Sequence, residues 1–338
     1  MSAPETKEVP AATVKLNNKR RKTVAVGDLH GDYYRLVRIL EEEKIVLPET
    51  LAWDPDAGNI DLVFIGDYVD WRGEPLEGDP GAWMLGPLRI IKLVMSLYDQ
   101  ANKLREDMPG FSSRVHPILG NHDQMMLDAL NIFNFLKDDE VSELIRESGG
   151  FWDFQKIFSK KRLPQEGQEA VARFINWYAQ GGEITMAAFG GMTAWKDAMC
   201  GDTGGFLRNE LKMAVEVGGW LYAHTLPDDK KYYRPLDELE KLPGDEMKKA
   251  KEEFMWGRSV WGYNYLTGQH IPVPNQKEFE KLLGSMGVEG AVVGHTPISR
   301  KDIITAFNGK LINIDLHGIP GSPAWVREWE PDEAEDVE

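Results

Sequence analysis

The stretch VAVGDLH, residues 24–30, contains the pattern that decides the fold. Its first three residues are apolar and partly β-branched, which is typical of a short buried strand. Gly27 allows the backbone to turn sharply where that strand ends. Asp28 and His30 are two residues apart, so on an extended strand end their side chains face the same side. The stretch therefore predicts a buried strand that carries a carboxylate and an imidazole at its carboxyl end.

The same arrangement, a short apolar run that ends in polar side chains, recurs further along the chain. It is found in LVFIGD (62–67), ILGNHD (118–123), WLYAH (220–224) and AVVGH (291–295). Amphipathic patterns with the spacing i, i+3, i+4, i+7 follow the first three runs, over 33–40, 90–97 and 126–133. Strands that alternate with helices indicate an α/β sheet, in which functional side chains lie beyond the carboxyl ends of the strands.

The polar side chains at these strand ends form a mixed set of nitrogen and oxygen ligands: Asp28, His30, Asp67, Asp70, Asn121, His122, His224 and His295. Such a set suits Mn, Fe or Zn. Each motif alone is more typical of a loop, but all of them in this order favour a metal site. Two divalent ions about 3.5–4 Å apart, bridged by a carboxylate and a water, generate hydroxide for in-line attack on phosphorus. One carboxylate must then serve both ions, and Asp67 is the natural candidate.

The composition is that of a globular protein with an acidic surface. The chain has 338 residues, of which 42% are hydrophobic, enough for a substantial core. A formal net charge of −16 repels nucleic acid and anionic lipid, so neither is expected as a partner. The single cysteine Cys200, the lack of a signal-peptide core and the lack of a long apolar stretch predict a cytoplasmic protein. The oligomeric state is left open.

The expected domain organisation is one large domain between two tails. Residues 1–22 lack hydrophobic periodicity and end in a basic run, which predicts a disordered arm. Residues 331–338 are mostly acidic and predict a disordered tail. Within the domain, 23–330, the stretch at about 138–215 is rich in aromatic residues and glycine pairs and is interpreted as a helical insertion or cap. Short apolar runs over 303–329 suggest closing strands of a second sheet.

Taken in order, the motifs resemble the signature of the calcineurin-like metallophosphoesterases. The matching segments are GDLHG (27–31), GDYVD (66–70), GNHD (120–123), His224 and GHT (294–296). GDYVD is similar to the phosphoprotein phosphatase branch, and GHTP (294–297) is more similar to bacterial-type members, the Shewanella-like phosphatases and the diadenosine tetraphosphatases. The resemblance implies an α/β fold with a two-sheet αββα sandwich and two metal ions at its edge, with Mn²⁺ as the first choice and Fe or Zn as alternatives.

The resemblance also implies a role for each matching residue. Asp28 and His30 bind the first ion, Asp67 bridges, and Asn121, His224 and His295 bind the second, while His122 is the general acid and Asp70 orients it. Three residues are candidates for binding the substrate phosphate: Arg72, Asn121 and Arg258.

The sequence departs from the family pattern beside two of these residues. Trp71 is inserted between Asp70 and Arg72, where the family has Asp-Arg-Gly, and Thr225 follows His224 where Gly is usual. The insertion could displace Arg72 from the phosphate. Arg258 lies in a Trp-x-Arg segment similar to one in bacterial-type members, although it could equally be a surface arginine stacked on a tryptophan.

The sequence therefore predicts a metal-dependent phosphomonoesterase, similar to serine/threonine protein phosphatases, that acts on a phosphorylated protein or a small phosphate ester. A dinucleoside polyphosphate hydrolase is the alternative, and a binding module that has lost catalysis is the third hypothesis. His116, His270 and His317 have no motif context and are interpreted as structural. Asp315, at an apparent strand end, is interpreted in the same way, although it could lie near the site.

Overall fold

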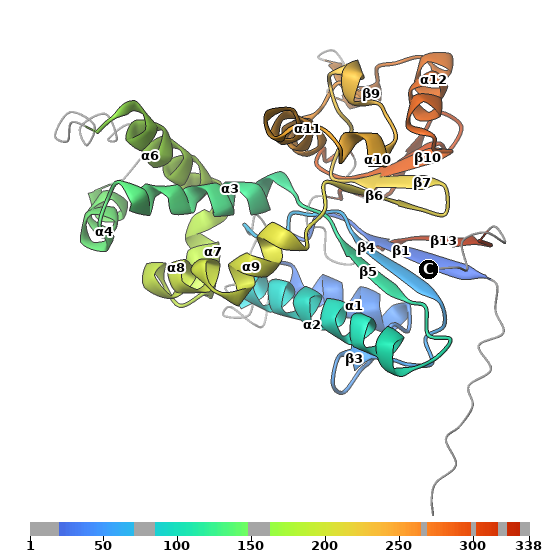
Figure 1. Ribbon diagram of the computed structural model, residues 1–338, viewed down its shortest axis with the longest axis horizontal. Helices are drawn as coiled ribbons and strands as arrows, with labels where there is room; N and C mark the ends of the chain where they lie inside the picture. Colours follow the sequence, from blue (N-terminus) through green and yellow to red (C-terminus); the bar gives the residue numbers. More distant parts are fainter. Residues whose placement is uncertain are drawn as a thin grey trace, which may run out of the picture.

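The computed structural model describes residues 20–70, 85–147, 163–264, 269–298, 302–316 and 323–331. Two sheets form its centre (Figure 1). The first has the order β13-β1-β4-β5, with the bounds β1 Arg21–Val26, β4 Ile60–Phe64, β5 Arg114–Pro117 and β13 Trp325–Trp329. In this sheet β1, β4 and β5 are parallel and β13 is antiparallel to β1.

The second sheet has the order β11-β12-β10-β7-β6. Its strands are β6 Ala214–Val217, β7 Trp220–Ala223, β10 Gly290–Val293, β11 Ile304–Ala306 and β12 Leu311–Asn313. The three inner strands β7, β10 and β12 are parallel, and β6 and β11 close the two edges in the antiparallel sense. Two short hairpins lie outside the sheets: β2 Val46–Leu47 with β3 Ala52–Trp53, and β8 Trp261–Asn264 with β9 Gln269–Pro272.

Three hydrophobic layers hold the sandwich together, because alternate residues of each central strand face opposite sides. Ala25 of β1 packs between the sheets against Tyr222 and Val292. Val24 and Val26 face the outer layer, which contains α1 (Tyr33–Glu42) and α2 (Gly86–Asp107). The opposite outer layer contains α10 (Leu236–Leu239), α11 (Gly244–Trp256) and α12 (Gln276–Met286). The predicted two-sheet αββα sandwich is therefore confirmed (Figure 1).

The chain between β5 and β6 is helical where it is described. Its elements are α3 Asn121–Ala129, a 3₁₀ turn Leu130–Asn134, α4 Asp138–Glu147, α6 Gln165–Trp177, a π-helical turn Tyr178–Gly182, α7 Glu183–Ala188, α8 Met192–Cys200 and α9 Asp202–Asn209. Trp177 and Trp195 belong to the same hydrophobic core as Phe64 of β4. These helices are therefore packed onto the first sheet, at one end of the sandwich (Figure 1).

Two sequence expectations about the chain ends are corrected. β1 begins at Arg21, so the last two residues of the predicted 1–22 arm belong to the first sheet, where the Arg21 guanidinium bonds the Asp61 carboxylate at 2.8 Å. Of the strands expected to close the second sheet, β13 instead pairs with β1 of the first. Trp325 and Trp329 explain this placement, since they belong to the apolar layer between the sheets.

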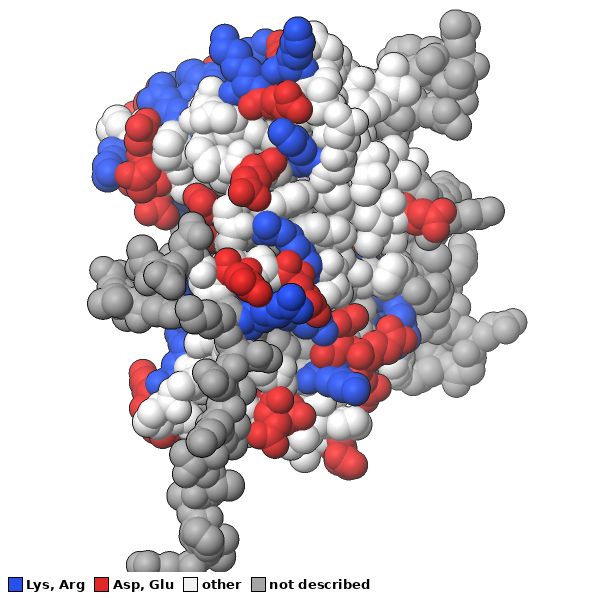
Figure 2. Space-filling model, turned by 90° about the vertical axis from the view of Figure 1, so that its right-hand side faces the viewer, with Lys and Arg blue, Asp and Glu red and all other residues white. Residues whose placement is uncertain are grey.

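The surface has no uniform charge on the face drawn in Figure 2. Acidic and basic side chains are interspersed there, and lysine and arginine are most frequent at the upper end of the view. In Figure 1 the same end of the molecule carries α10, α11 and α12. Among the described helices, none has both the length and the apolar character needed to cross a bilayer.

Candidate metal centre

The predicted ligands meet where the carboxyl ends of β1, β4, β5, β7 and β10 converge. Four of the polar residues there take up the left-handed backbone region: His30 (φ 44°), Asp67 (φ 53°), Asp70 (φ 66°) and His295 (φ 65°). Non-glycine residues adopt this conformation rarely, and where they do the strain is often associated with a functional site. The turns at these strand ends are therefore made partly by the ligand candidates themselves.

Close backbone contact between two of these turns places the residues that follow. A Cβ atom on Gly66, whose φ is +103°, would lie 2.5 Å from the Gly120 nitrogen. The buried Asp123 carboxylate joins the same turns, since it accepts the N–H groups of Asp67 (2.8 Å), Tyr68 (3.0 Å) and Gly120 (3.0 Å). In the sequence, Asp123 stood out only as the last residue of the GNHD motif. In the structure it fastens the turn after β4 to the start of α3.

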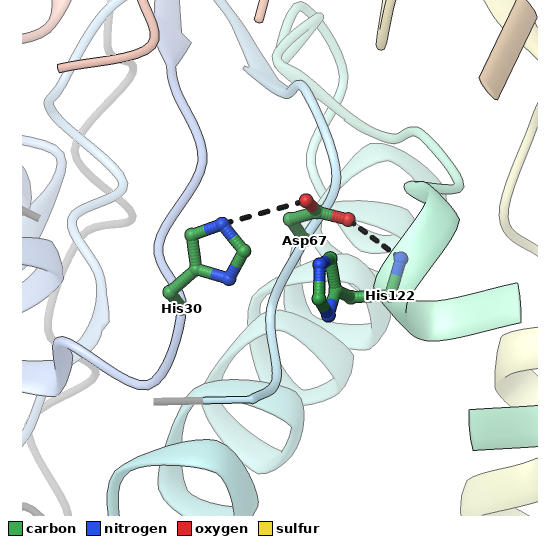
Figure 3. Close-up of side chains that lie close together, drawn as sticks. All are labelled: His30, Asp67 and His122. Carbon is green, nitrogen blue, oxygen red and sulfur yellow. Dashed lines mark hydrogen bonds and ion pairs between the residues drawn. The ribbon is translucent and has the colours of Figure 1, made fainter. Parts of the chain in front are cut away.

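Asp67 lies at the middle of the site (Figure 3). Its Oδ1 accepts the backbone N–H of His122 at 2.9 Å, and its Oδ2 lies 3.5 Å from Nε2 of His30 and 3.6 Å from Nε2 of His224. Burial opposes the charge on this carboxylate, but the neighbouring imidazoles outweigh burial and hold the pKa of Asp67 below its ordinary value. Asp67 belongs to two groups of potential metal ligands. The first is His30, Asp67 and His122, and the second is Asp28, Asp67 and His224; within each group the ligand atoms lie within 4.8 Å of one another.

His30 and His224 present their Nε2 atoms to Asp67 because backbone carbonyl groups hold the other ring nitrogen, Nδ1. Nδ1 of His30 lies 3.2 Å from the Val69 carbonyl oxygen, and Nδ1 of His224 lies 2.9 Å from that of Ile65. A carbonyl oxygen only accepts, so Nδ1 carries a proton, and whenever the ring is neutral its Nε2 lone pair faces the carboxylate. Histidines that bind metals are commonly fixed in this way by the other ring nitrogen.

Asn121, His224 and His295 form the opposite side of the site. The Asn121 Oδ1 atom lies 2.8 Å from Nε2 of His224 and 2.9 Å from Nδ1 of His295. Burial, together with the charges of His224 and Arg258, lowers the pKa of His295 to about 2, so this ring is neutral and able to coordinate. Thr225, the unusual neighbour of His224, donates its hydroxyl to the Gly257 carbonyl at 2.7 Å and so ties the turn after β7 to the end of α11.

Asp28 supplies the observation that fits a cation most directly. Its Oδ2 accepts the N–H of His295 at 2.9 Å, whereas its Oδ1, like Nε2 of His295, is buried without a hydrogen-bond partner among the described residues. Burial and the charges of Asp315 and Asp67 raise the pKa of Asp28 well above its ordinary value. Burying oxygen and nitrogen atoms without a partner, beside clustered carboxylates, is costly unless a cation binds them. The residues present therefore fit the divalent ions that the sequence predicts.

His122 and Asp70 form a buried pair at the rim of this cluster. Nδ1 of His122 donates to Oδ2 of Asp70 at 2.7 Å, and the two side chains are 3% and 0% exposed. Burial is the main cause that raises the pKa of Asp70, against the opposing effect of its bond to His122. The His122 ring meets the His30 ring edge to face at 5.0 Å. His122 is thus oriented by a carboxylate and lies beside the ligand cluster, which consists of the predicted metal ligands Asp28, His30, Asp67, Asn121, His224 and His295.

Other predicted residues fall at different distances from the centre. The Arg258 guanidinium bonds the Thr296 hydroxyl at 3.4 Å, next to His295. Asp315 is buried, and its charge acts on Asp28. His116 bonds Asp61 at 3.0 Å at the opposite end of β4. Arg72, Trp71 and His317 lie outside the described residues, as does the side chain of His270.

Arg35 is a buried neighbour that sequence reasoning missed. It lies on α1 and donates to the Asp28 carbonyl oxygen at 2.8 Å. A charged residue among Leu36, Ile39 and Leu40, the buried residues of the same helix, is the signal that would have indicated it.

A groove of about 570 Å³ adjoins the centre, between α3, α6 and α11. Trp256 lines it and meets the His295 ring edge to face at 6.0 Å. The charged lining is mixed and includes Lys231, Lys248, Lys249, Lys251, Asp128, Asp228, Glu252 and Glu253. The groove therefore offers a ligand both signs of charge next to the ligand cluster.

The sandwich and the ligand set at its strand ends together define a metallophosphoesterase. The chain belongs to the calcineurin-like phosphoesterase family, whose sequence pattern matches residues 21–299. Members of this family use a dinuclear metal centre.

Known relatives show how far the similarity extends. The chain is 30% identical to Shewanella-like protein phosphatase 1 of Plasmodium berghei (strain Anka) over 130 residues, which are 38% of this chain and 29% of that protein. It is 30% identical to the serine/threonine-protein phosphatase BSL2 of Arabidopsis thaliana over 131 residues, 39% of this chain and 10% of that protein. The matches therefore span less than a third of either relative. A solved cold-active protein tyrosine phosphatase shares the fold at a TM-score of 0.51 and 18% identity, covering 91% of this chain and 73% of that one.

Proposed function

We propose that this chain is a metal-dependent phosphomonoesterase, similar to serine/threonine protein phosphatases, which hydrolyses phosphate esters of proteins or small molecules. The observation that carries the proposal is the position of Asp67, whose Oδ2 lies 3.5 Å from Nε2 of His30 and 3.6 Å from Nε2 of His224, one histidine of each proposed ion site. A carboxylate shared by two ligand groups is what a two-ion centre requires. In this proposal Asp28 and His30 hold one ion, Asp67 bridges, and the other ion is held by Asn121, His224 and His295.

The ligand types favour Mn²⁺ and also fit Fe or Zn, because imidazole, carboxylate and amide oxygen are combined without thiolate. Bound there, two divalent ions would supply Lewis-acid activation of a water molecule and would neutralise charge on the phosphate during in-line displacement. Arg258, which reaches Thr296 beside His295, is proposed to bind phosphate oxygens together with Asn121. Arg72 keeps its predicted phosphate-binding role as part of the same proposal.

His122 is proposed as the general acid. When the bond between phosphorus and the leaving oxygen breaks, an alkoxide would form unless a proton arrived in the transition state. Nδ1 of His122 is occupied by Asp70 at 2.7 Å, so Nε2 is the atom that delivers this proton. Asp70 stabilises the imidazolium that holds the proton before transfer.

The groove beside the centre supports a phosphopeptide over a long polyanion. Dinucleoside polyphosphates carry several adjacent negative charges, and a lining of uniformly positive charge would favour them. The lining combines lysines of α11 with acidic residues such as Asp128 of α3. A peptide, which presents both polar and charged groups around one phosphate, matches such a mixed lining better.

A competition experiment tests the proposal. Mn²⁺-loaded protein is offered a phosphoserine peptide and diadenosine tetraphosphate together, and chelated protein is the control. We expect metal-dependent turnover with a kcat/KM at least ~10-fold higher for the peptide, a difference of about 1.4 kcal/mol in transition-state stabilisation. The reverse ranking would establish the dinucleoside polyphosphate hydrolase. Two bound ions without turnover of either substrate, or of p-nitrophenyl phosphate, would establish a binding module.

A further inference from the structure

Two side chains from the helical segment between α3 and β6 reach into the site and bond Asp70. The indole Nε1 of Trp177 donates to Oδ1 of Asp70 at 3.1 Å, and the hydroxyl of Thr185 donates to the same oxygen at 2.7 Å. The Thr185 hydroxyl also accepts the backbone N–H of Asp70 at 2.9 Å. Since His122 bonds Oδ2, both oxygens of this carboxylate are engaged, one by the helical segment and one by the imidazole.

The local backbone is built so that this approach is possible. Trp177 ends α6 and Thr185 lies in α7, and the π-helical turn between them contains Gly181 and Gly182. A Cβ atom on Gly181, whose φ is +111°, would lie 3.0 Å from the backbone and Cβ of Asp70. A Cβ atom on Gly182 would lie 2.5 Å from the Trp177 ring. A side chain at Gly181 would push the helical segment away from Asp70, and a side chain at Gly182 would displace the Trp177 ring.

Aromatic packing fixes the donor from the other side. The Trp177 ring stacks on the Trp195 ring at 4.7 Å with an interplanar angle of 22°, and both residues are fully buried. Trp195 shares the packing but not the polar contact, because its Nε1 is buried without a hydrogen-bond partner among the described residues. The two tryptophans therefore differ in one respect that matters here, the bond to Asp70.

We propose that Trp177 and Thr185 are positioning residues that set the orientation of His122 through Asp70. Rotation of the Asp70 carboxylate would break both bonds at Oδ1 inside a buried site, so the two donors hold Oδ2 at the imidazole. The helical segment is then part of the proton-transfer apparatus as well as part of the core. This inference rests on the proposed general-acid role of His122.

The test compares two substrates that differ in their need for a proton. A phosphoserine peptide has an alkoxide leaving group, whereas p-nitrophenyl phosphate releases a nitrophenolate that leaves without protonation. The variants are Thr185→Val, which removes the hydroxyl at similar volume, and Trp177→Phe, which removes the N–H group. Thr185→Ser is the conservative rescue, and Trp195→Phe is the packing control. All are made in the full chain loaded with Mn²⁺.

We expect Thr185→Val and Trp177→Phe to lower kcat on the peptide by ~10–100-fold, as the loss of an outer hydrogen-bond partner commonly does, with KM unchanged. On p-nitrophenyl phosphate the loss should be less than about threefold, Thr185→Ser should restore the peptide rate, and Trp195→Phe should affect both substrates equally. In metal-free protein, the downfield N–H resonance of the His122 ring should shift or broaden in Thr185→Val but not in Thr185→Ser.

The inference is overturned if Thr185→Val and Trp177→Phe slow both substrates equally, or neither, while His122→Asn still separates the two. If His122→Asn itself fails to separate them, the general-acid role falls and this inference falls with it. If wild-type protein turns over neither substrate, the proposed function fails as a whole. Where Thr185→Val does not fold, Trp177→Phe and the resonance of His122 decide.

Discussion

Replacement of the shared carboxylate, Asp67→Asn, is the most direct test of the centre. Asparagine keeps the shape and an oxygen that can accept the His122 N–H group, a bond of 2.9 Å in the structure. It removes the negative charge that lies 3.5 Å from Nε2 of His30 and 3.6 Å from Nε2 of His224. Because Asp67 lies beside one histidine of each proposed ion site, the substitution should weaken both sites at once.

The size of the effect follows from that shared position. Removing one preorganised electrostatic group that acts at a single point in an active site costs about 10²–10³ in rate. Asp67 acts on two ions, so we expect a loss of at least ~10³ in kcat/KM, about 4 kcal/mol of transition-state stabilisation. Metal content should fall from two ions per chain to one or fewer, measured by elemental analysis after dialysis against dilute Mn²⁺.

Asp61→Asn is the matched control, because Asp61 lies in β4, the strand that leads into the turn of Asp67, and is also buried. Its carboxylate bonds Arg21 and His116, at 2.8 and 3.0 Å, and not the ligand cluster. This variant should lower the thermal midpoint while leaving two ions and near-normal turnover. The reasoning is refuted if Asp67→Asn also retains two ions per chain and wild-type kcat/KM.

Three further predictions concern single groups of the site. His122→Asn should lower kcat on a phosphoserine peptide by ~10²–10⁴ but harm p-nitrophenyl phosphate much less; equal losses at unchanged metal content would contradict proton donation. Arg258→Ala should lower kcat/KM by about 10–100-fold, the value of one or two charged hydrogen bonds. The control is Arg234→Ala, which changes an exposed residue that bonds the Lys231 carbonyl and should leave kcat/KM unchanged. An unchanged kcat/KM in Arg258→Ala would show that another residue contacts the phosphate. Burial raises the pKa of Asp28 and of Asp123 in the metal-free fold, so their contribution to stability is present at acid pH and is lost as pH rises through the raised pKa. The thermal midpoint of chelated protein should therefore fall between pH 5 and pH 8, while that of Mn²⁺-loaded protein should fall less. A difference between the two midpoints that stays constant with pH would count against a carboxylate ion site.

Much of the site could be predicted because short-range patterns encode strand ends. A buried strand requires a run of apolar residues, and a functional turn after it requires glycine and polar side chains within the next few positions. The segments around Asp28, Asp67, Asn121 and His295 each satisfy this rule locally, whereas His224 follows its strand without a glycine. Parallel strands place their carboxyl ends at one edge, so the convergence of these residues follows from the fold class.

The tertiary structure alone decided which of these groups meet, because the contacts join distant parts of the chain. The His295 N–H group bonds Asp28 across 267 positions, and the Trp177 indole bonds Asp70 across 107. No local period records such pairs, since they depend on how the two sheets and the helical segment pack. The same reason explains why β13 joined the first sheet and why the helices at 163–209 proved to be part of the core around Asp70. Local sequence thus determines the groups at each strand end, and long-range packing determines their partners.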